Sequence, residues 1–243
     1  MALTDNLISY WKLNESSGNA ADEVGGNTLT NNNTVTYSAG KINNAANFAS
    51  ASSQYLSKAD IFEYQKGQAL SVQSWLNIAS TGASFALVGN HVSGATGGWH
   101  TEYLSTDKLR FIISNATSDG FADTTDVVGF STSTWYHVVM TTSNFGVPAS
   151  QKIYVNGTSA GMTEQATLDA NAIGYGVSTF ELGAHFVIPA KFLNGSLDEV
   201  GIWERELTAA EVTELYNSGA GLAYPFTSTA STPRRRMMMG IGS

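Results

Sequence analysis

Residues 194–203 read NGSLDEVGIW, and this stretch decides the fold class. Asn194-Gly195 is a strong turn signal, because both residues tolerate the backbone angles of tight turns. The following residues form a short run that ends in Ile202 and Trp203, without the length or the 3.6-residue period of a helix. We therefore predict a β-strand over residues 197–203.

Similar runs recur at short intervals through the preceding part of the chain. The turns between them contain Gly, Asn, Asp or Ser, and Asn156-Gly157 repeats the turn signal. Helical segments between the runs are missing, so the pattern favours a sandwich or jelly roll over a doubly wound fold. The strands predicted in this way cover residues 69–78, 85–91, 99–104, 109–114, 135–142, 152–155 and 180–184.

One helix is predicted after the last strand. Residues 208–211 read TAAE, a capping box in which Thr208 and Glu211 satisfy each other's backbone N–H groups. Apolar residues then recur at positions 212, 215 and 216, and Gly219 is the expected end of the helix. We expect this short helix to lie across the sandwich.

Composition and charge narrow the function classes. The chain has 243 residues, of which 42% are hydrophobic and 13% are charged, and its net charge is -8. An acidic chain of this kind predicts no nucleic-acid partner. The absence of cysteine excludes disulfides and Cys-based zinc sites. No stretch approaches the roughly 20 apolar residues of a membrane helix, and the N-terminus lacks the pattern of a Sec signal peptide.

The chain divides into two unequal parts. Residues 1–226 read as one β-rich domain. Residues 227–243 read TSTASTPRRRMMMGIGS, which has neither strand nor helix periodicity. We predict that this basic, Met-rich tail is a flexible appendage outside the core.

Seven sequence blocks occur in a fixed order along the chain. They are LISYWKLNESSG (7–18), DEVGGN (22–27), LSVQSWL (70–76), WYHVV (135–139), IYVNG (153–157), NGSLDEVGIW (194–203) and the helix at 208–216. Together they resemble laminin-G-like, concanavalin A-like jelly-roll domains of bacterial or phage type. The resemblance implies an all-β, two-sheet antiparallel jelly-roll sandwich with one short C-terminal helix. It covers roughly residues 7–224, but it is architectural and does not by itself fix function.

The resemblance also implies one structural calcium ion. Calcium prefers six to eight oxygen ligands, which carboxylates, amides and backbone carbonyls supply. The expected ligands are Asp22, Gly25 and Asn27 in the first turn, with Asp198 from the closing strand. The alternative is that Asp22 and Asp198 only cap turns by accepting hydrogen bonds from backbone N–H groups.

Trp99 is the candidate sugar-stacking residue. It follows a glycine-rich loop and precedes polar side chains, and an exposed tryptophan beside polar groups suits a sugar ring. The alternative is that it covers the edge of the sandwich, whereas Trp75 and Trp203 are expected to be buried between the two sheets. The predicted ligand-binding residues are Trp99, His100, Glu102, Tyr103, Arg110 and Asn115.

Catalysis is not expected. A glycoside hydrolase needs two carboxyl groups about 5–9.5 Å apart. Asp198 and Glu199 are adjacent, so on a regular strand they would point to opposite faces. His137 lies inside a strand motif and is expected to be a packed, hydrogen-bonded residue.

We therefore expect a non-catalytic carbohydrate-binding or adhesion module, displayed on a phage particle or cell surface. Its predicted partners are a glycan or cell-surface polysaccharide and, through the tail, other virion proteins. Membrane insertion is not expected, and the predicted location is the virion surface or the extracellular space. A purely structural virion decoration or fibre protein is the alternative, and a glycoside hydrolase comes third.

Overall fold

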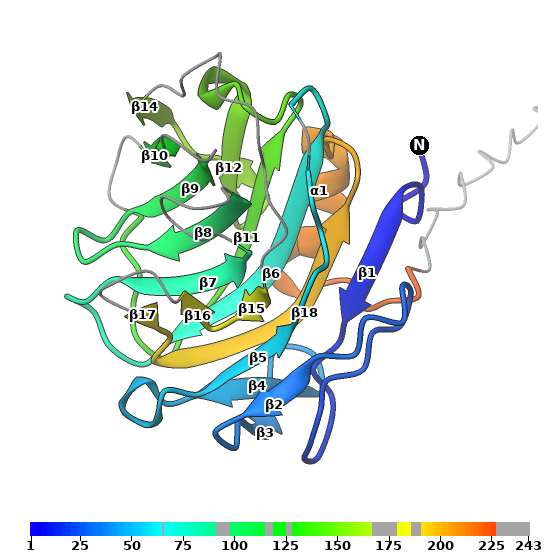
Figure 1. Ribbon diagram of the computed structural model, residues 1–243, viewed down its shortest axis with the longest axis vertical. Coiled ribbons are helices and arrows are strands. Elements are labelled where there is room, and N and C mark those ends of the chain that lie inside the picture. The colour runs from blue at the N-terminus through cyan, green and yellow to red at the C-terminus, as the bar shows by residue number, and fades with distance from the viewer. Residues whose placement is uncertain are drawn as a thin grey trace, which may run out of the picture.

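The computed structural model describes residues 1–64, 66–90, 98–114, 119–124, 128–166, 179–185 and 191–226. Within these ranges the chain forms two large antiparallel sheets that share one core, and one short α-helix near the C-terminal end (Figure 1). The predicted two-sheet jelly-roll sandwich is therefore confirmed. The predicted tail at 227–243 lies outside the described residues.

The first sheet contains the long strands that the sequence predicts. β18 (Gly195–Trp203) lies near its middle, and β4 (Asn44–Phe48) and β1 (Leu7–Trp11) pair with the opposite ends of this one strand. The strand order is β13 (Thr158–Ser159), β12 (Gln151–Val155), β11 (Trp135–Thr142), β6 (Leu70–Ile78), β18 (Gly195–Trp203), β4 (Asn44–Phe48) and β3 (Thr36–Ala39), with β1 (Leu7–Trp11) on β18.

The second sheet packs against the first. A small two-stranded ladder of β16 (Ala184–His185) and β17 (Lys191–Phe192) follows β15 in the chain. The strand order of the second sheet is β14 (Met162–Ala166), β10 (Asp119–Thr124), β9 (Leu109–Ser114), β8 (Gly98–Tyr103), β7 (Phe85–Gly89), β15 (Phe180–Leu182), β5 (Tyr55–Lys58) and β2 (Thr30–Asn32).

Strand prediction succeeded where the runs are long and apolar. The strands predicted at 109–114 and 135–142 have those bounds, and the others differ at their ends by a few residues. The N-terminal strands β2 and β3 were not predicted from the run pattern. They are three and four residues long, and the seven residues are Thr, Asn, Ser, Tyr and Ala. Such segments lack the alternation of a half-buried strand.

The main core lies between the two sheets. Val72 and Leu76 of β6 contribute to it from the first sheet, and Trp99 and Phe111 contribute from the second. These side chains recur at even spacing along their strands, because successive residues of a strand point to opposite faces. The residues between them therefore point out of the sandwich.

A second apolar cluster lies on the other face of the first sheet. Trp203, Val212 and Leu215 belong to it, so α1 (Ala209–Tyr216) covers this face. The predicted burial of Trp75 and Trp203 is confirmed, since both side chains are at most 2% exposed. Their predicted place between the sheets is wrong. Trp203 packs under the helix, and the Trp75 ring stacks on Tyr216 with centroids 5.9 Å apart.

The helix begins at the predicted capping box. The Thr208 side chain accepts a hydrogen bond from the Glu211 backbone, and the Glu211 side chain accepts one from the Thr208 backbone. The helix ends at Asn217, which takes the left-handed conformation with φ 48°, rather than at the predicted Gly219. No helix among the described residues is long and apolar enough to span a membrane.

The two ends of the domain are joined. β1 pairs with β18, and the Trp203 indole N–H donates to the Leu3 carbonyl at 2.7 Å. Arg205 donates to the carbonyls of Asp5 and Ala2 and forms a two-point ion pair with Glu211 on the helix. The first residues, the last strand and the helix are thus held as one unit.

Candidate functional site

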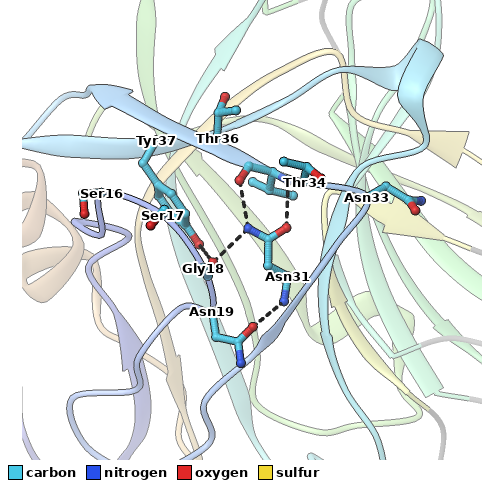
Figure 2. A pocket seen from close by; sticks show the side chains of 10 residues that line it. Ser16, Ser17, Gly18, Asn19, Asn31, Asn33, Thr34, Thr36 and Tyr37 are labelled. Carbon is cyan, nitrogen blue, oxygen red and sulfur yellow. Dashed lines mark hydrogen bonds between the residues drawn. The ribbon is translucent and has the colours of Figure 1, made fainter.

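A polar pocket of about 620 Å³ opens beside the short N-terminal strands, and Figure 2 shows it from close by. Its volume falls within the range of about 300–1,000 Å³ that is usual for small-molecule sites. One wall is the turn before β2 and the other is the connection from β2 to β3. The lining residues are Ser16, Ser17, Gly18, Asn19, Asn31, Asn33, Thr34, Val35, Thr36 and Tyr37.

Asn31 holds the two walls together. Its side-chain amide donates to the carbonyls of Gly18 and Val35, both at 2.8 Å, and its side-chain oxygen accepts from the Val35 N–H at 2.7 Å (Figure 2). Its own backbone N–H donates to the Asn19 side chain at 3.0 Å. Asn31 therefore fixes the shape of the pocket and uses its own polar groups to do so.

Tyr37 provides the aromatic surface of the pocket. Its hydroxyl donates to the Gly18 carbonyl at 2.9 Å, which fixes the ring against the opposite wall. Partial burial, together with the charge of Glu15, raises the pKa of Tyr37, so the hydroxyl stays protonated at neutral pH. The ring is half-buried, and the Ser16, Ser17 and Thr36 side chains around it are exposed.

The chemistry of the lining is neutral. Hydroxyl and amide groups surround one aromatic ring, and no carboxylate, imidazole or ammonium group is among the lining side chains. Such groups exchange hydrogen bonds with hydroxyl-rich ligands, and an aromatic ring packs against the apolar face of a sugar. No sequence pattern marks this pocket, since its residues read as ordinary turn formers.

The predicted exposure of Trp99 is wrong. Its side chain is 0% exposed and packs in the main core, where its ring lies edge-on to Tyr64 with centroids 6.4 Å apart. Tyr103 lies in the same core. A fully buried ring cannot stack on a sugar, so neither residue can serve as the proposed sugar platform. The predicted residue Asn115 lies outside the described residues.

The other predicted ligand residues lie together on the opposite face of the second sheet. His100 and Glu102 alternate with the core-facing residues of β8, and Arg110 pairs with Glu102 across the ladder to β9. Arg110 forms a two-point ion pair with Asp123 of β10, at 2.6 and 2.8 Å. These three side chains therefore lie near one another, on the opposite face from Trp99 and Tyr103, and they are largely buried rather than open to a ligand.

The residues predicted to bind calcium have other partners. The Asp22 carboxylate accepts hydrogen bonds from the backbone N–H groups of Tyr10, Val24 and Asn27 and from the Ser9 hydroxyl. Partial burial opposes its ionisation, but these four donors lower the pKa of Asp22. Asp22 thus acts as a turn cap in this structure.

The other predicted ligands follow the same pattern. A side chain at Gly25 would collide with the Ile8 carbonyl, which explains the glycine without a metal. The Asn27 carbonyl accepts from the Trp11 indole at 2.9 Å. Asp198 accepts from the backbone N–H groups of Lys41 and Ile42, both at 2.8 Å. A calcium ion that joins Asp22 to Asp198 stays a prediction.

Asp198 and Glu199 form a buried acidic pair. The ladder shifts register between Asp198 and Gly201, and Glu199 has φ 50°, so the two side chains do not alternate as on a regular strand. The Tyr10 hydroxyl donates to Glu199 at 2.6 Å, and burial, Glu199 and Asp198 all raise the pKa of Tyr10. The expectation that the carboxyls point to opposite faces is therefore wrong.

We expect the stability of the protein to fall between pH 5 and pH 8. Burial raises the pKa of Asp198 to about 8 and that of Glu199 to about 7. In the unfolded chain both groups titrate near pH 4. A raised folded-state pKa stabilises the fold fully below the unfolded value, and this contribution is lost as the pH rises through the folded value. Thermal melts across this pH range measure the slope.

A variant pair tests the origin of that slope. The double variant Asp198→Asn, Glu199→Gln removes two of the titrating groups and should reduce the fall of the melting temperature with pH, while Glu181, whose pKa burial also raises to about 8, accounts for the slope that remains. Asp60→Asn, at an exposed position, should keep the wild-type slope. A wild-type melting temperature that rises steadily from pH 5 to pH 8 would contradict the assignment.

The fold and the pocket together define a jelly-roll domain with one uncharged pocket beside its short N-terminal strands. Residues 49–213 match the concanavalin A-like lectin/glucanases superfamily. This match spans more than half of the chain, so the chain belongs to that superfamily, as the laminin-G-like resemblance predicts. A comparison with curated protein sequences finds no significant match.

Solved structures share the fold at low sequence identity. Domain 4 of AbnA, a GH43 extracellular arabinanase from Geobacillus stearothermophilus solved with arabinotriose, matches with TM-score 0.65 and 18% identity over 86% of this chain and 97% of its own. The binding domain of Paraclostridial Mosquitocidal Protein 1 gives TM-score 0.67 and 16% identity over 88% of this chain and 52% of its own.

A third structure has the same fold. The binding domain of Botulinum Neurotoxin DC, solved with SialylT, gives TM-score 0.61 and 16% identity over 89% of this chain and 52% of its own. This chain therefore spans about half the length of the two toxin structures. At such identities the likeness concerns the fold alone.

Proposed function

We propose that this chain is a non-catalytic carbohydrate-binding module that holds a neutral oligosaccharide in the pocket beside Tyr37. The observation that carries the proposal is the lining of that pocket, which combines hydroxyl and amide groups with one fixed aromatic ring. Structures of the same fold solved with arabinotriose and with SialylT support a carbohydrate ligand.

The lining also favours binding over hydrolysis. Glycoside hydrolysis needs a pair of carboxyl groups at the scissile bond, and no carboxylate lines this pocket. The neighbouring acid Glu15 is not a lining residue, and one of its oxygens accepts from the Ala21 N–H at 2.8 Å. The module is therefore expected to leave its ligand intact.

A neutral ligand fits the electrostatics better than an anionic one. The lining offers no cation to an acidic sugar, and the chain as a whole carries a net charge of -8. Like charges repel over a range of about 10 Å at moderate salt. Arabinotriose, which is neutral, is accordingly the first probe.

Blocking the pocket should abolish sugar binding. Thr36 is an exposed residue on its wall, and Thr36→Arg would place a long side chain across the opening. We expect the affinity for an oligosaccharide selected on a glycan array, or for arabinotriose, to fall by about tenfold or more, equivalent to about 1.4 kcal/mol. Isothermal titration calorimetry measures the change.

Thr158→Arg is the matched control. Thr158 is also an exposed threonine on an edge strand of the same sheet, but β13 lies at the opposite edge from β3. It should bind sugar like the wild type, and both variants should melt at the wild-type temperature. If the two variants bind the sugar equally well, the binding site is not this pocket. A wild type that binds no glycan on the array would overturn the proposed function itself.

A further inference from the structure

A cluster of two histidines and one glutamate lies on the face of the second sheet that points away from the main core. His100 and Glu102 project from β8, and His185 comes from β16. All three side chains are at most 5% exposed. β8 presents His100 and Glu102 on one face of the sheet. The ladder of β16 and β17 places His185 beside them.

The three residues are close enough to share one ion. Each offers one ligand atom, and these atoms all lie within 4.8 Å of one another. His100 Nε2 is 3.0 Å from Glu102 Oε1, and the two imidazole rings stack with centroids 4.0 Å apart. In a tetrahedral zinc site with bonds of about 2.0–2.2 Å, ligand atoms lie about 3.3–3.6 Å apart. The three ligand atoms therefore lie near enough to share one ion, once the two imidazole rings turn out of their stack to point their nitrogen lone pairs at it.

The two carboxylate oxygens of Glu102 have different surroundings. Its first oxygen, Oε1, lies 3.0 Å from His100 Nε2 and also contacts the Lys191 ammonium group. Its second oxygen, Oε2, is buried without a hydrogen-bond partner among the described residues. A buried carboxylate oxygen without a partner is costly, and a bound metal ion is one way to satisfy it.

Lys191 places a positive charge beside Glu102. Its ammonium group contacts Glu102 Oε1, and its side chain remains 30% exposed. A lysine on a flexible stem can turn into solvent when a doubly charged ion takes over the carboxylate. The ammonium group is therefore a competitor that a metal ion must displace.

We propose that His100, Glu102 and His185 bind one divalent transition-metal ion, with zinc as the best fit to the donor set. Two imidazoles and one carboxylate are a recurrent zinc-binding set, and three protein ligands leave a fourth position for water or another small ligand. Cluster geometry and the buried oxygen of Glu102 carry the inference, which is independent of the sugar pocket. Calcium, which prefers oxygen ligands, would bind poorly here.

Metal titration of the whole chain tests this site. After dialysis against EDTA, the wild type should bind one Zn²⁺ ion in calorimetry, and Co²⁺ should give the visible absorption of a low-symmetry nitrogen–oxygen site. His185→Gln should lower the affinity by more than the roughly 10- to 100-fold that loss of an outer partner costs. Lys191→Met should raise the affinity, because it removes the competing ammonium group.

Glu181→Gln is the matched control. Glu181 is a buried carboxylate on the same sheet, and its partner in the ladder, Gly89, pairs in turn with His100. This variant should bind Zn²⁺ like the wild type. The proposal fails if the wild type shows neither Zn²⁺ binding nor Co²⁺ absorption at micromolar protein. It also fails if His185→Gln, folded by circular dichroism, binds as tightly as the wild type.

Discussion

Trp99→Ala is expected to lower the free energy of unfolding by about 3–5 kcal/mol, the usual cost of truncating a core tryptophan. The Trp99 ring is fully buried and packs against Tyr64 and Phe180, with centroids 6.4 and 6.2 Å away. Removal of the ring would leave a large cavity between the sheets, which rigid strands on both sides cannot fill. Urea unfolding measures the loss.

Trp99→Phe tests whether the loss of stability comes from lost ring volume or from a lost hydrogen bond. The Trp99 indole N–H is buried without a hydrogen-bond partner among the described residues, so phenylalanine removes no bond and keeps most of the packing. This variant should lose clearly less stability than Trp99→Ala. If Trp99→Ala unfolds like the wild type but no longer binds sugar, Trp99 is a surface residue that contacts the sugar, and its assignment to the core is wrong.

Arg205→Ala is expected to cost a similar amount, about 3–5 kcal/mol, because it breaks a buried ion pair and leaves one charge alone. Arg205 and Glu211 are 7% and 6% exposed, and two hydrogen bonds of 2.9 and 2.7 Å join them. The change would also leave the carbonyls of Ala2 and Asp5 without this donor. Chemical denaturation of the full chain measures the effect.

The exposed pair of Lys152 and Glu206 is the control. The Lys152 side chain is 51% exposed, and surface pairs of this kind contribute about 0–1 kcal/mol. Lys152→Ala should therefore change stability little. The double variant Arg205→Met, Glu211→Leu should recover part of the loss, since it removes both charges together but also removes the capping-box acceptor of the Thr208 N–H. If Arg205→Ala lowers the free energy of unfolding no more than Lys152→Ala does, the buried ion pair does not hold the helix against the domain.

Sequence periodicity could predict the strands and the core-facing side of β8, but not that the other side of β8 is covered as well. β8 reads GWHTEY, in which Trp99 and Tyr103 share one face and His100 and Glu102 share the other. This alternation alone would have placed Trp99 inside, and greater weight on it than on the preceding glycine loop would have given the correct face. The burial of His100 and Glu102 was not predictable, because β16 and β17 come from a distant part of the chain.

The first sheet shows the same difficulty. Almost every residue of β6 is buried, since one face packs on the second sheet and the other on the helix segment. Its apolar residues alternate, which places Trp75 on the side away from the core-facing residues, but this pattern does not show that the helix covers that side. The pocket was equally hidden, because Asn31 joins Gly18 to Val35 through contacts that no local pattern encodes.

The joining of the first residues to the last strand has a consequence for engineering. Met1, Ala2 and Phe226 line one small pocket, so the first residues and the last described residue lie close together. A peptide linker of a few residues could therefore connect the ends of the folded unit, and a circular permutant opened at an exposed loop would keep every strand pairing. For the same reason the unit could be inserted into a surface loop of a host protein, whose chain would leave and re-enter at nearly one point.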